Sequence, residues 1–507
     1  MKKEKNQLKI GILLSYVNLG IGNLIPIFYT PVMLDLLGQA EYGLYKLSSS
    51  VTSYLSLISL GIGSAVSRYL IKAWTEQGQE AEENTLGLFN IIFQIIAAVT
   101  FLVGFVLISQ LWRWYGASLT AQELSRMQIL VFLMVCNTAI SFSSTPYVSV
   151  VSTHERFLFL QLMNILSTCV MPIVNLLMLW LGYASIGMAA SSLAIGVIIR
   201  IIYLLYVRRG LRIRARYNHL PFHQLREILT FSFWIFVSNV VAQLYNATDT
   251  VMIGAVPALA VTGVAVYNVG LTFNSMMFSL TTSISSLLSP KVNKMVFSGA
   301  SKEELTALSS RVGRLQCYIM VLIIAGFIAF GQPFIYFYAG EEYRDAYWVA
   351  ILMMVPNIIP LTQSVFLSVI IAENRHRFRS LTYLGIAMLN VIGTWLLLKP
   401  FGIIGAAFMT GFALLLGQGL VMNWFYYRRC GLNVFCFFRE IMPVLVVPIL
   451  LCSITLFLTK WIDFYRPVNL ILGILLFALT DLIINWFLIM NSYEKSLIFS
   501  ILKNKVK

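Results

Sequence analysis

Long apolar runs separated by short clusters of charge dominate this chain. Most of these runs contain 18 residues or more, which is enough for an α-helix to cross a lipid bilayer. The period-two alternation of a membrane β-barrel does not occur in them. The sequence therefore predicts an all-α polytopic membrane protein with about 14 transmembrane helices. We place these spans at residues 10–34, 44–71, 84–110, 128–152, 158–181, 184–206, 229–256, 263–289, 314–338, 346–372, 380–398, 402–427, 442–460 and 469–490.

The second half of the chain repeats features of the first half at an offset of about 215–221 residues. In each copy, a basic loop ending in Phe leads into a span that carries an asparagine and, five residues later, a tryptophan. A glycine then opens the next helix. These residues are Asn175, Trp180 and Gly187 in the first copy and Asn390, Trp395 and Gly405 in the second. Because each copy has an even number of spans, the two copies share one orientation and are related by an axis along the membrane normal.

This repeat predicts four segments along the chain. Two six-helix lobes, residues 1–206 and 229–428, are related by a pseudo-two-fold axis and joined by a basic linker at 207–228. Residues 429–507 add two more helices and a tail. A cavity between the two lobes is the expected consequence of such an arrangement.

Composition and charge agree with a membrane protein. Hydrophobic residues make up 59% of the chain and charged residues 11%, whereas soluble domains carry about 25% charged residues. The net charge of +15 would suggest a nucleic-acid partner in a soluble protein. Here the basic residues gather in alternate loops, 27 on one side and 7 on the other. This asymmetry predicts a multi-pass membrane protein with both termini in the cytoplasm, and no nucleic-acid partner.

Catalytic and metal-binding patterns are missing from the sequence. The six cysteines are scattered singly, without a CxxC pair or a His-rich neighbour, so they are interpreted as small apolar residues. The longest loops have about 20 residues and contain no nucleophile with an adjacent base. We therefore predict no enzyme, no catalytic residue and no cofactor, while coupling to protons or sodium ions stays open. The loop at His154 is interpreted as a solvated cytoplasmic turn, and Arg314 as a charge flanking the ninth span.

Polar residues inside the seventh span are the first candidates for function. Gln243, Asn246 and Asp249 follow one another at intervals of three residues and predict a polar stripe along one helix. A carboxylate inside a span is costly and usually faces water or a partner. Asp249 could therefore bind a proton, a cation or sugar hydroxyls. Alternatively, it lies close enough to the helix end to reach the headgroups of the outer leaflet.

Three more charged residues lie within predicted spans. Arg68 and Arg200 offer guanidinium groups that suit a diphosphate, but an arginine near a helix end can also extend to the membrane surface. Asp481 lies near the centre of the last span. It either lines a transport path or holds the last two helices against the rest of the protein. These three residues complete the predicted transport path, together with Gln243, Asn246 and Asp249.

Several stretches resemble the polysaccharide transporters of the multidrug/oligosaccharidyl-lipid/polysaccharide exporter superfamily. They are LGIGSAVSRYL at 60–70, TDTVMIG at 248–254 and SSLLSPKVNK at 285–294. The resemblance covers essentially the whole chain. In their order and spacing, these stretches are similar to those of the flippases that move O-antigen and capsule repeats. It implies two lobes around a lumen that opens alternately to each side. The implied substrate is an oligosaccharide linked to undecaprenyl diphosphate.

The resulting hypothesis is a flippase of the bacterial cytoplasmic (inner) membrane that serves surface polysaccharide biosynthesis and works by alternating access. Its expected partners are the polyprenyl-diphosphate-linked oligosaccharide, membrane lipids, and a polysaccharide polymerase or other glycan-assembly proteins. Two alternatives stay open. One is a cation-coupled multidrug exporter of the same superfamily, and the other is a membrane scaffold for glycan assembly that transports nothing.

Overall fold

A computed structural model describes residues 2–373 and 376–496 of the chain. The tail at 497–507 and the side chains of 286–291, within the stretch SSLLSPKVNK, lie outside the described part. The chain is 88% helical, and the described residues contain no strand. Within the described residues, eleven helices are long and apolar enough to cross a membrane. The prediction of an all-α, multi-pass membrane protein is therefore confirmed.

The difference between fourteen predicted spans and eleven long helices arises at three places. Spans 380–398 and 402–427 run together across a kink at Gly402, whose φ is +58°. Span 346–372 is broken into three short helices near Pro356 and Pro360. Proline has no backbone N–H to continue a helix, which explains this break. Span 263–289 lies in α9 (Ala260–Phe297), part of which has undescribed side chains.

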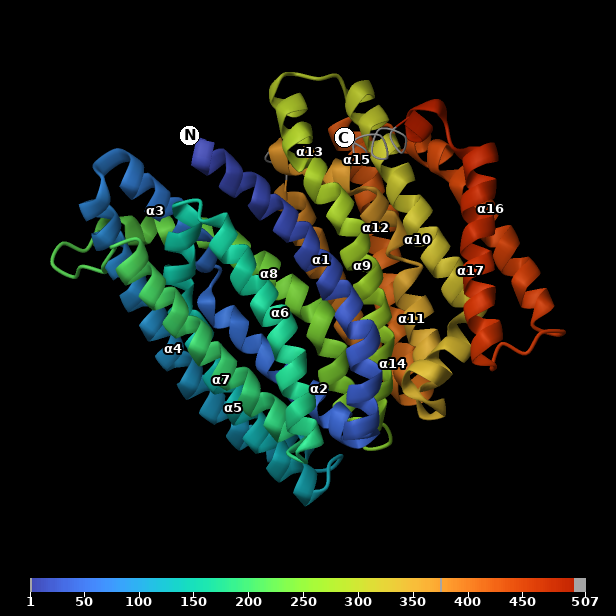
Figure 1. Ribbon diagram of the computed structural model, residues 1–507, viewed down its shortest axis with the longest axis horizontal. Helices are drawn as coiled ribbons and strands as arrows, with labels where there is room; N and C mark the ends of the chain where they lie inside the picture. Colours follow the sequence, from blue (N-terminus) through green and yellow to red (C-terminus); the bar gives the residue numbers. More distant parts are fainter. Residues whose placement is uncertain (1, 374–375, 497–507) are drawn as a thin grey trace. The chain divides into compact units, whose positions relative to one another are not determined.

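The chain forms two compact units, Met1–Ala265 and Val266–Lys507, which we describe one at a time. In the first unit, α4 packs against α5, α5 against α7, and α1 against α6 (Figure 1). Its elements are α1 (Lys2–Leu37), α2 (Gln39–Ser53), η1 (Tyr54–Ser59), α3 (Gly63–Gln77), α4 (Gln79–Tyr115), α5 (Ala121–Thr153), α6 (Phe157–Trp180), α7 (Ala184–Leu205), η2 (Tyr206–Gly210), η3 (Phe222–Gln224), α8 (Leu225–Gly254) and the start of α9.

A left-handed turn separates the two halves of the predicted second span. After the 3₁₀ segment η1, Leu60 has φ +49° and Gly61 φ +73°. A Cβ atom on Gly61 would lie 2.9 Å from the carbonyl oxygen of Ser232 in α8. Both the backbone angle and the close approach of α8 therefore require glycine at this position. The turn lets α2 and α3 pack against the same neighbour, α8.

The basic loop after α7 is fixed to the start of α4 by buried acidic side chains. Glu83, which is buried, accepts hydrogen bonds from Arg216 Nε at 2.7 Å and from the backbone N–H of Arg214 at 3.2 Å. The exposed Glu80 binds Arg216 Nη1 at 2.9 Å. These contacts hold this part of the predicted linker against the start of α4, and we call it the strap.

The interpretation of the His154 loop as a solvated turn is wrong. The Nε2 atom of His154 lies 2.9 Å from a carboxylate oxygen of Glu82, which is fully buried. The imidazole ring also packs against Trp74, with ring centroids 4.8 Å apart. The sequence could not reveal this contact because Glu82 lies 72 residues away, at the start of α4.

The second unit is built around α10, which packs against α11, α12, α13, α16 and α17. Figure 1 shows α16 and α17, at the red end of the colour scale, beside α10. The elements are the rest of α9, α10 (Lys302–Ala339), η4 (Glu341–Tyr343), α11 (Ala346–Met354), α12 (Ile358–Thr362), α13 (Ser364–Ala372), α14 (His376–Leu414), η5 (Leu415–Met422), α15 (Asn423–Cys430), α16 (Val434–Leu458), α17 (Pro467–Ile484) and η6 (Asn485–Ile489).

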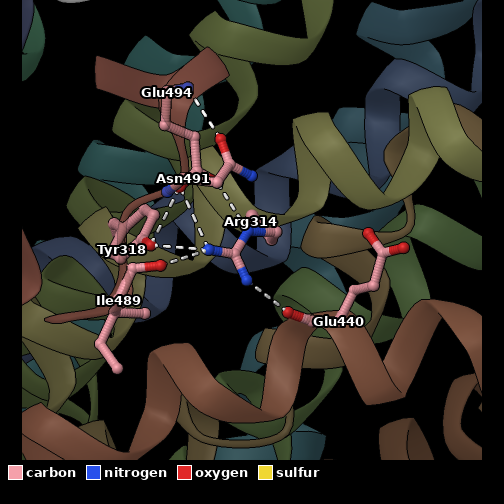
Figure 2. A network of polar contacts seen from close by, with 6 residues as sticks. All are labelled: Arg314, Tyr318, Glu440, Ile489, Asn491 and Glu494. Carbon is pink, nitrogen blue, oxygen red and sulfur yellow. Dashed lines mark hydrogen bonds and ion pairs between the residues drawn. The ribbon is translucent and has the colours of Figure 1, made fainter.

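Arg314 joins α10 to the last two helices and to the segment that follows them (Figure 2). Its guanidinium group binds both carboxylate oxygens of Glu494, at 2.6 and 3.1 Å. It also donates to the carbonyl oxygens of Glu440 at 2.7 Å and Ile489 at 3.0 Å, and to the hydroxyl of Tyr318 at 3.0 Å. Arg314 is 8% exposed, so its interpretation as a flanking surface charge is corrected.

Candidate functional site

One face of α2 carries polar side chains along the whole helix. They recur at alternating intervals of three and four residues, which places them on one side of an α-helix. These residues are Gln39, Tyr42, Lys46, Ser49 and Ser53. The opposite face buries Gly43, Leu44, Leu47 and Val51. The helix is therefore amphipathic within a predicted membrane span, and its polar face forms the candidate site.

Lys46 is the charged group of this polar face. Its side chain is half-buried, and its ammonium group lies 5.5 Å from the ring centroid of Tyr42. Among the described residues, Lys46 forms no ion pair. The acidic residue nearest to it on α2, Glu41, is already paired with Arg126 at 2.8 Å. A cation without a neutralising partner inside a membrane span is costly and points to a function.

Sequence reasoning missed Lys46 because it placed the second span at 44–71. Lys46 then lies at the span's edge and is counted with the loop charges. In the structure α2 begins at Gln39, so Lys46 lies two turns inside the helix. The three- and four-residue spacing of Tyr42, Lys46 and Ser49 is the signal that could have revealed it.

Helix α8 brings two of the predicted residues to the end of this face. The amide of Gln243 donates a hydrogen bond to the hydroxyl of Ser53. Further along α8, the hydroxyl groups of Thr248 and Tyr54 are 2.6 Å apart. Asp249 follows directly and is only 2% exposed. Its charge acts on the nearby Tyr54. Polar contacts therefore connect α8 to the end of α2.

Asn246 lies on the same helix as Gln243 and Asp249 but in a different environment. Its side chain is exposed, whereas Gln243 is half-buried and Asp249 is buried. A step of three residues turns a helix by about 300°, so three such residues spread over a third of the circumference. Asn246 lies between Gln243 and Asp249 on this arc and is the exposed member of the three.

The remaining predicted residues lie elsewhere. Arg68 is exposed on α3, beyond the left-handed turn that follows η1, with its guanidinium carbon 4.7 Å from the ring centroid of Phe231. Arg200 is half-buried on α7, where it acts electrostatically on Tyr147. Asp481 is buried in α17 of the second unit. The structure thus places Gln243 and Asp249 near the end of α2, with Gln243 on its polar face and Asp249 beside Tyr54, and it places Arg68 and Arg200 elsewhere.

A second set of hydrogen bonds connects α1, α6 and α7 in the first unit. Asn175 donates to the hydroxyl of Tyr29 at 3.3 Å and accepts from the hydroxyl of Ser191 at 2.8 Å. The second unit contains a related contact, in which Thr410 donates to Asn390 at 3.1 Å. These contacts hold helices together.

The groups of the site are suited to bind an anionic or polar ligand. An ammonium group attracts an anion, while hydroxyl and amide groups exchange hydrogen bonds with a polar ligand. No group of three His, Cys, Asp or Glu side chains that could hold a metal ion occurs in the part of the chain that is described. The cysteines of this part, which include the exposed Cys436, form no disulfide bond.

Comparison with known proteins gives one matching family and several solved structures with the same fold. Residues 8–295 match a family described as polysaccharide biosynthesis protein. No curated protein matches the sequence. Among solved structures, the lipid II flippase MurJ in an inward closed conformation superposes with a TM-score of 0.74 at 13% identity, covering 95% of this chain and 100% of that one.

Multidrug transporters share the same fold. An inward-facing MATE family transporter of the MOP superfamily superposes with a TM-score of 0.62 at 13% identity, covering 84% of this chain and 98% of that one. The MATE multidrug transporter DinF-BH has a TM-score of 0.52 at 13% identity and covers 84% of this chain and 95% of that one. At such identities these likenesses establish the fold.

Proposed function

Because this chain belongs to the polysaccharide biosynthesis protein family, we propose that it is a flippase for an oligosaccharide carried on a polyprenyl diphosphate. The chain is a membrane protein with the fold of transporters, and residues 8–295 match the family. The proposed substrate has an anionic diphosphate, a polar sugar headgroup and an apolar tail. We place the protein in the bacterial inner membrane, with both termini in the cytoplasm.

Lys46 is the observation that carries this proposal. A sugar headgroup cannot cross hydrocarbon unaided, because its hydroxyl groups would lose their hydrogen bonds to water. The polar face of α2 offers replacements for that water, and the uncompensated ammonium of Lys46 offers a positive charge for the diphosphate. The polyprenyl tail can stay in the lipid while the headgroup follows the polar face.

The charge of Lys46 also bears on the alternative of a multidrug exporter. A cation on the polar face repels cationic drugs, whereas it attracts an anionic diphosphate. Asp249 supports the exporter in part, since a buried carboxylate is the group that a coupling proton or cation would use. A scaffold that transports nothing has no need for a half-buried cation without a neutralising partner.

Complementation of a deletion strain tests the proposal. The native host lacking this protein would carry the wild type, Lys46→Arg, Lys46→Met or Lys460→Met, each at a verified membrane level. Lys460 is the matched control, because it is an exposed lysine in the turn between α16 and α17. We expect Lys46→Met to lose surface glycan and to accumulate lipid-linked oligosaccharide inside the cell, and Lys46→Arg to retain part of the activity. Unchanged surface glycan in the deletion strain with greater drug sensitivity would favour the exporter.

A further inference from the structure

Two buried carboxyl groups near the end of the second unit have opposite surroundings. Glu494 is 1% exposed and Asp481 is 2% exposed. Glu494 meets the guanidinium group of Arg314 through both oxygens and accepts a third hydrogen bond from the backbone N–H of Asn491 at 2.9 Å (Figure 2). This carboxylate is therefore ionised, because a buried charge that is paired and hydrogen-bonded is stable.

Asp481 has no such cation. Among the described residues it forms no ion pair, and its Oδ1 atom has no hydrogen-bond partner. The group that interacts with its carboxyl is the amide of Asn485, one helical turn further along the same face. Asn485 is 1% exposed, and its own Oδ1 atom also has no partner among the described residues. One oxygen on each of these two buried side chains thus lacks a hydrogen-bond donor among the described residues.

The surroundings of Asp481 supply no other charge within the described part of the chain. Towards one end of α17, Phe477 and Ala478 line an apolar groove of about 260 Å³ against α10. Towards the other end, Arg314 binds the carbonyl of Ile489, about two turns beyond Asp481. The titratable groups on α10 and α16, the two long helices packed against α17, are Lys302, Glu303, Glu304, Arg311, Arg314, Cys317, Tyr318, Tyr336, Tyr338, Cys436, Arg439, Glu440 and Cys452, while η6 has none. Arg314 is already bound to Glu494, and the Arg439 and Glu440 side chains are exposed.

We propose that Asp481 and Asn485 form a proton-binding site in which the carboxyl group of Asp481 holds one proton at neutral pH. The added proton turns one carboxylate oxygen into an O–H donor. A carboxylic acid and a primary amide can pair through two hydrogen bonds, O–H to the amide oxygen and N–H to the acid oxygen. A single proton therefore supplies the missing donor to Asn485 Oδ1 and removes the buried negative charge.

A proton fits this pair of oxygens better than a metal cation does. Hard cations take six or more oxygen ligands, and this site offers two open oxygens. The site also differs from Asp249, which lies in the first unit and has an interaction partner there. If α17 moves away from α10 and water reaches Asp481, the proton can leave. This use of the site, as a coupling site for transport, rests on the proposed function.

Infrared spectroscopy of the full-length protein in lipid vesicles tests the site without reference to transport. A protonated carboxyl group gives a C=O stretching band apart from that of a carboxylate, and the band shifts in D₂O. We expect the wild type to show this band at neutral pH, and Asp481→Asn to lose that component. Glu494→Gln should keep it, because Glu494 is ionised. Asn485→Leu should shift the band by removing the amide partner.

Identical spectra of the wild type and Asp481→Asn in the carboxylic-acid region would overturn the proposal. Should Asp481→Asn fail to fold, Asn485→Leu decides, since an unshifted band would equally contradict the pairing. Thermal unfolding adds a second measure. A neutral acid replaced by an amide of the same shape should leave the melting temperature almost unchanged, whereas a fall as large as that of Glu494→Gln would mean that Asp481 is ionised and paired with a cation. None of these results depends on whether the protein transports an oligosaccharide.

Discussion

Ser191 of α7 donates a hydrogen bond to the side chain of Asn175 on α6, with 2.8 Å between the two oxygen atoms. Thr410 does the same to Asn390 in the second unit, at 3.1 Å. A second pair of contacts also corresponds. His154 meets Glu82 in the first unit, and Glu373 meets Lys302 in the second, with the charges exchanged. The sequence repeat thus preserves the places where helices are joined, although the chemical groups differ.

Replacing either asparagine by leucine should cost little stability. Hydrogen bonds between membrane helices are typically worth about 0.5–1.5 kcal/mol. The hydroxyl of Ser191 also reaches the carbonyl of Met188 at 3.0 Å, so Asn175→Leu leaves it satisfied. We expect Asn175→Leu to lower the free energy of unfolding by about 1 kcal/mol, measured by denaturant titration in mixed micelles. A loss of several times that amount would show that Asn175 has a role beyond joining helices.

The pair Arg314–Glu494 should matter much more. Removing one partner of a buried ion pair leaves the other charge uncompensated, which costs about 3–5 kcal/mol. Glu494→Gln should therefore lower the melting temperature strongly and expose the segment after η6 to proteases. Glu440→Gln is the matched control, because Arg314 binds the backbone carbonyl of Glu440 and not its side chain. Equal effects of the two substitutions would contradict this assignment.

The strap formed by the basic loop should loosen when Glu83 is neutralised. Glu83→Gln removes the charge that holds Arg216 and weakens the bond to the backbone of Arg214. Trypsin, which cuts after arginine, should then cleave between Arg208 and Arg216 severalfold faster than in the wild type. Glu80→Gln serves as the control, since Glu80 is exposed and its ion pair contributes little. Equal cleavage of both variants would mean that the loop is held by other contacts.

Composition and apolar periodicity predict the fold class well. Membrane spans depend on about 20 consecutive apolar residues, which is a local property of the sequence. The break at Gly402 is also local, since the turn between spans 380–398 and 402–427 is predicted where the structure places a residue with φ +58°. Helix ends are harder to predict. Because the predicted start of this span is five residues later than the start of α2, Lys46 lies at the edge of the predicted span and is counted with the loop charges.

The contacts of the buried charges could not be predicted from the sequence. Arg314 and Glu494 are 180 residues apart, and His154 and Glu82 are 72 residues apart. A single sequence contains no information on which distant helices meet, so each of these residues resembles an ordinary loop charge. Asp481 could be singled out from the sequence because a carboxylate near the centre of a predicted span is unusual. Its pairing with Asn485 depended on knowing that both side chains are buried.

Transport of a lipid-linked oligosaccharide by the purified protein tests the proposed function most directly. The protein would be reconstituted in vesicles with the lipid-linked oligosaccharide of its host, and substrate reaching the other leaflet would be counted by enzymatic labelling of its exposed sugars. We predict rapid translocation by the wild type and by Lys460→Met, and at least a tenfold slower rate for Lys46→Met. Translocation by Lys46→Met at the wild-type rate would contradict the role of Lys46, and no translocation by an intact wild type would contradict the proposed function itself.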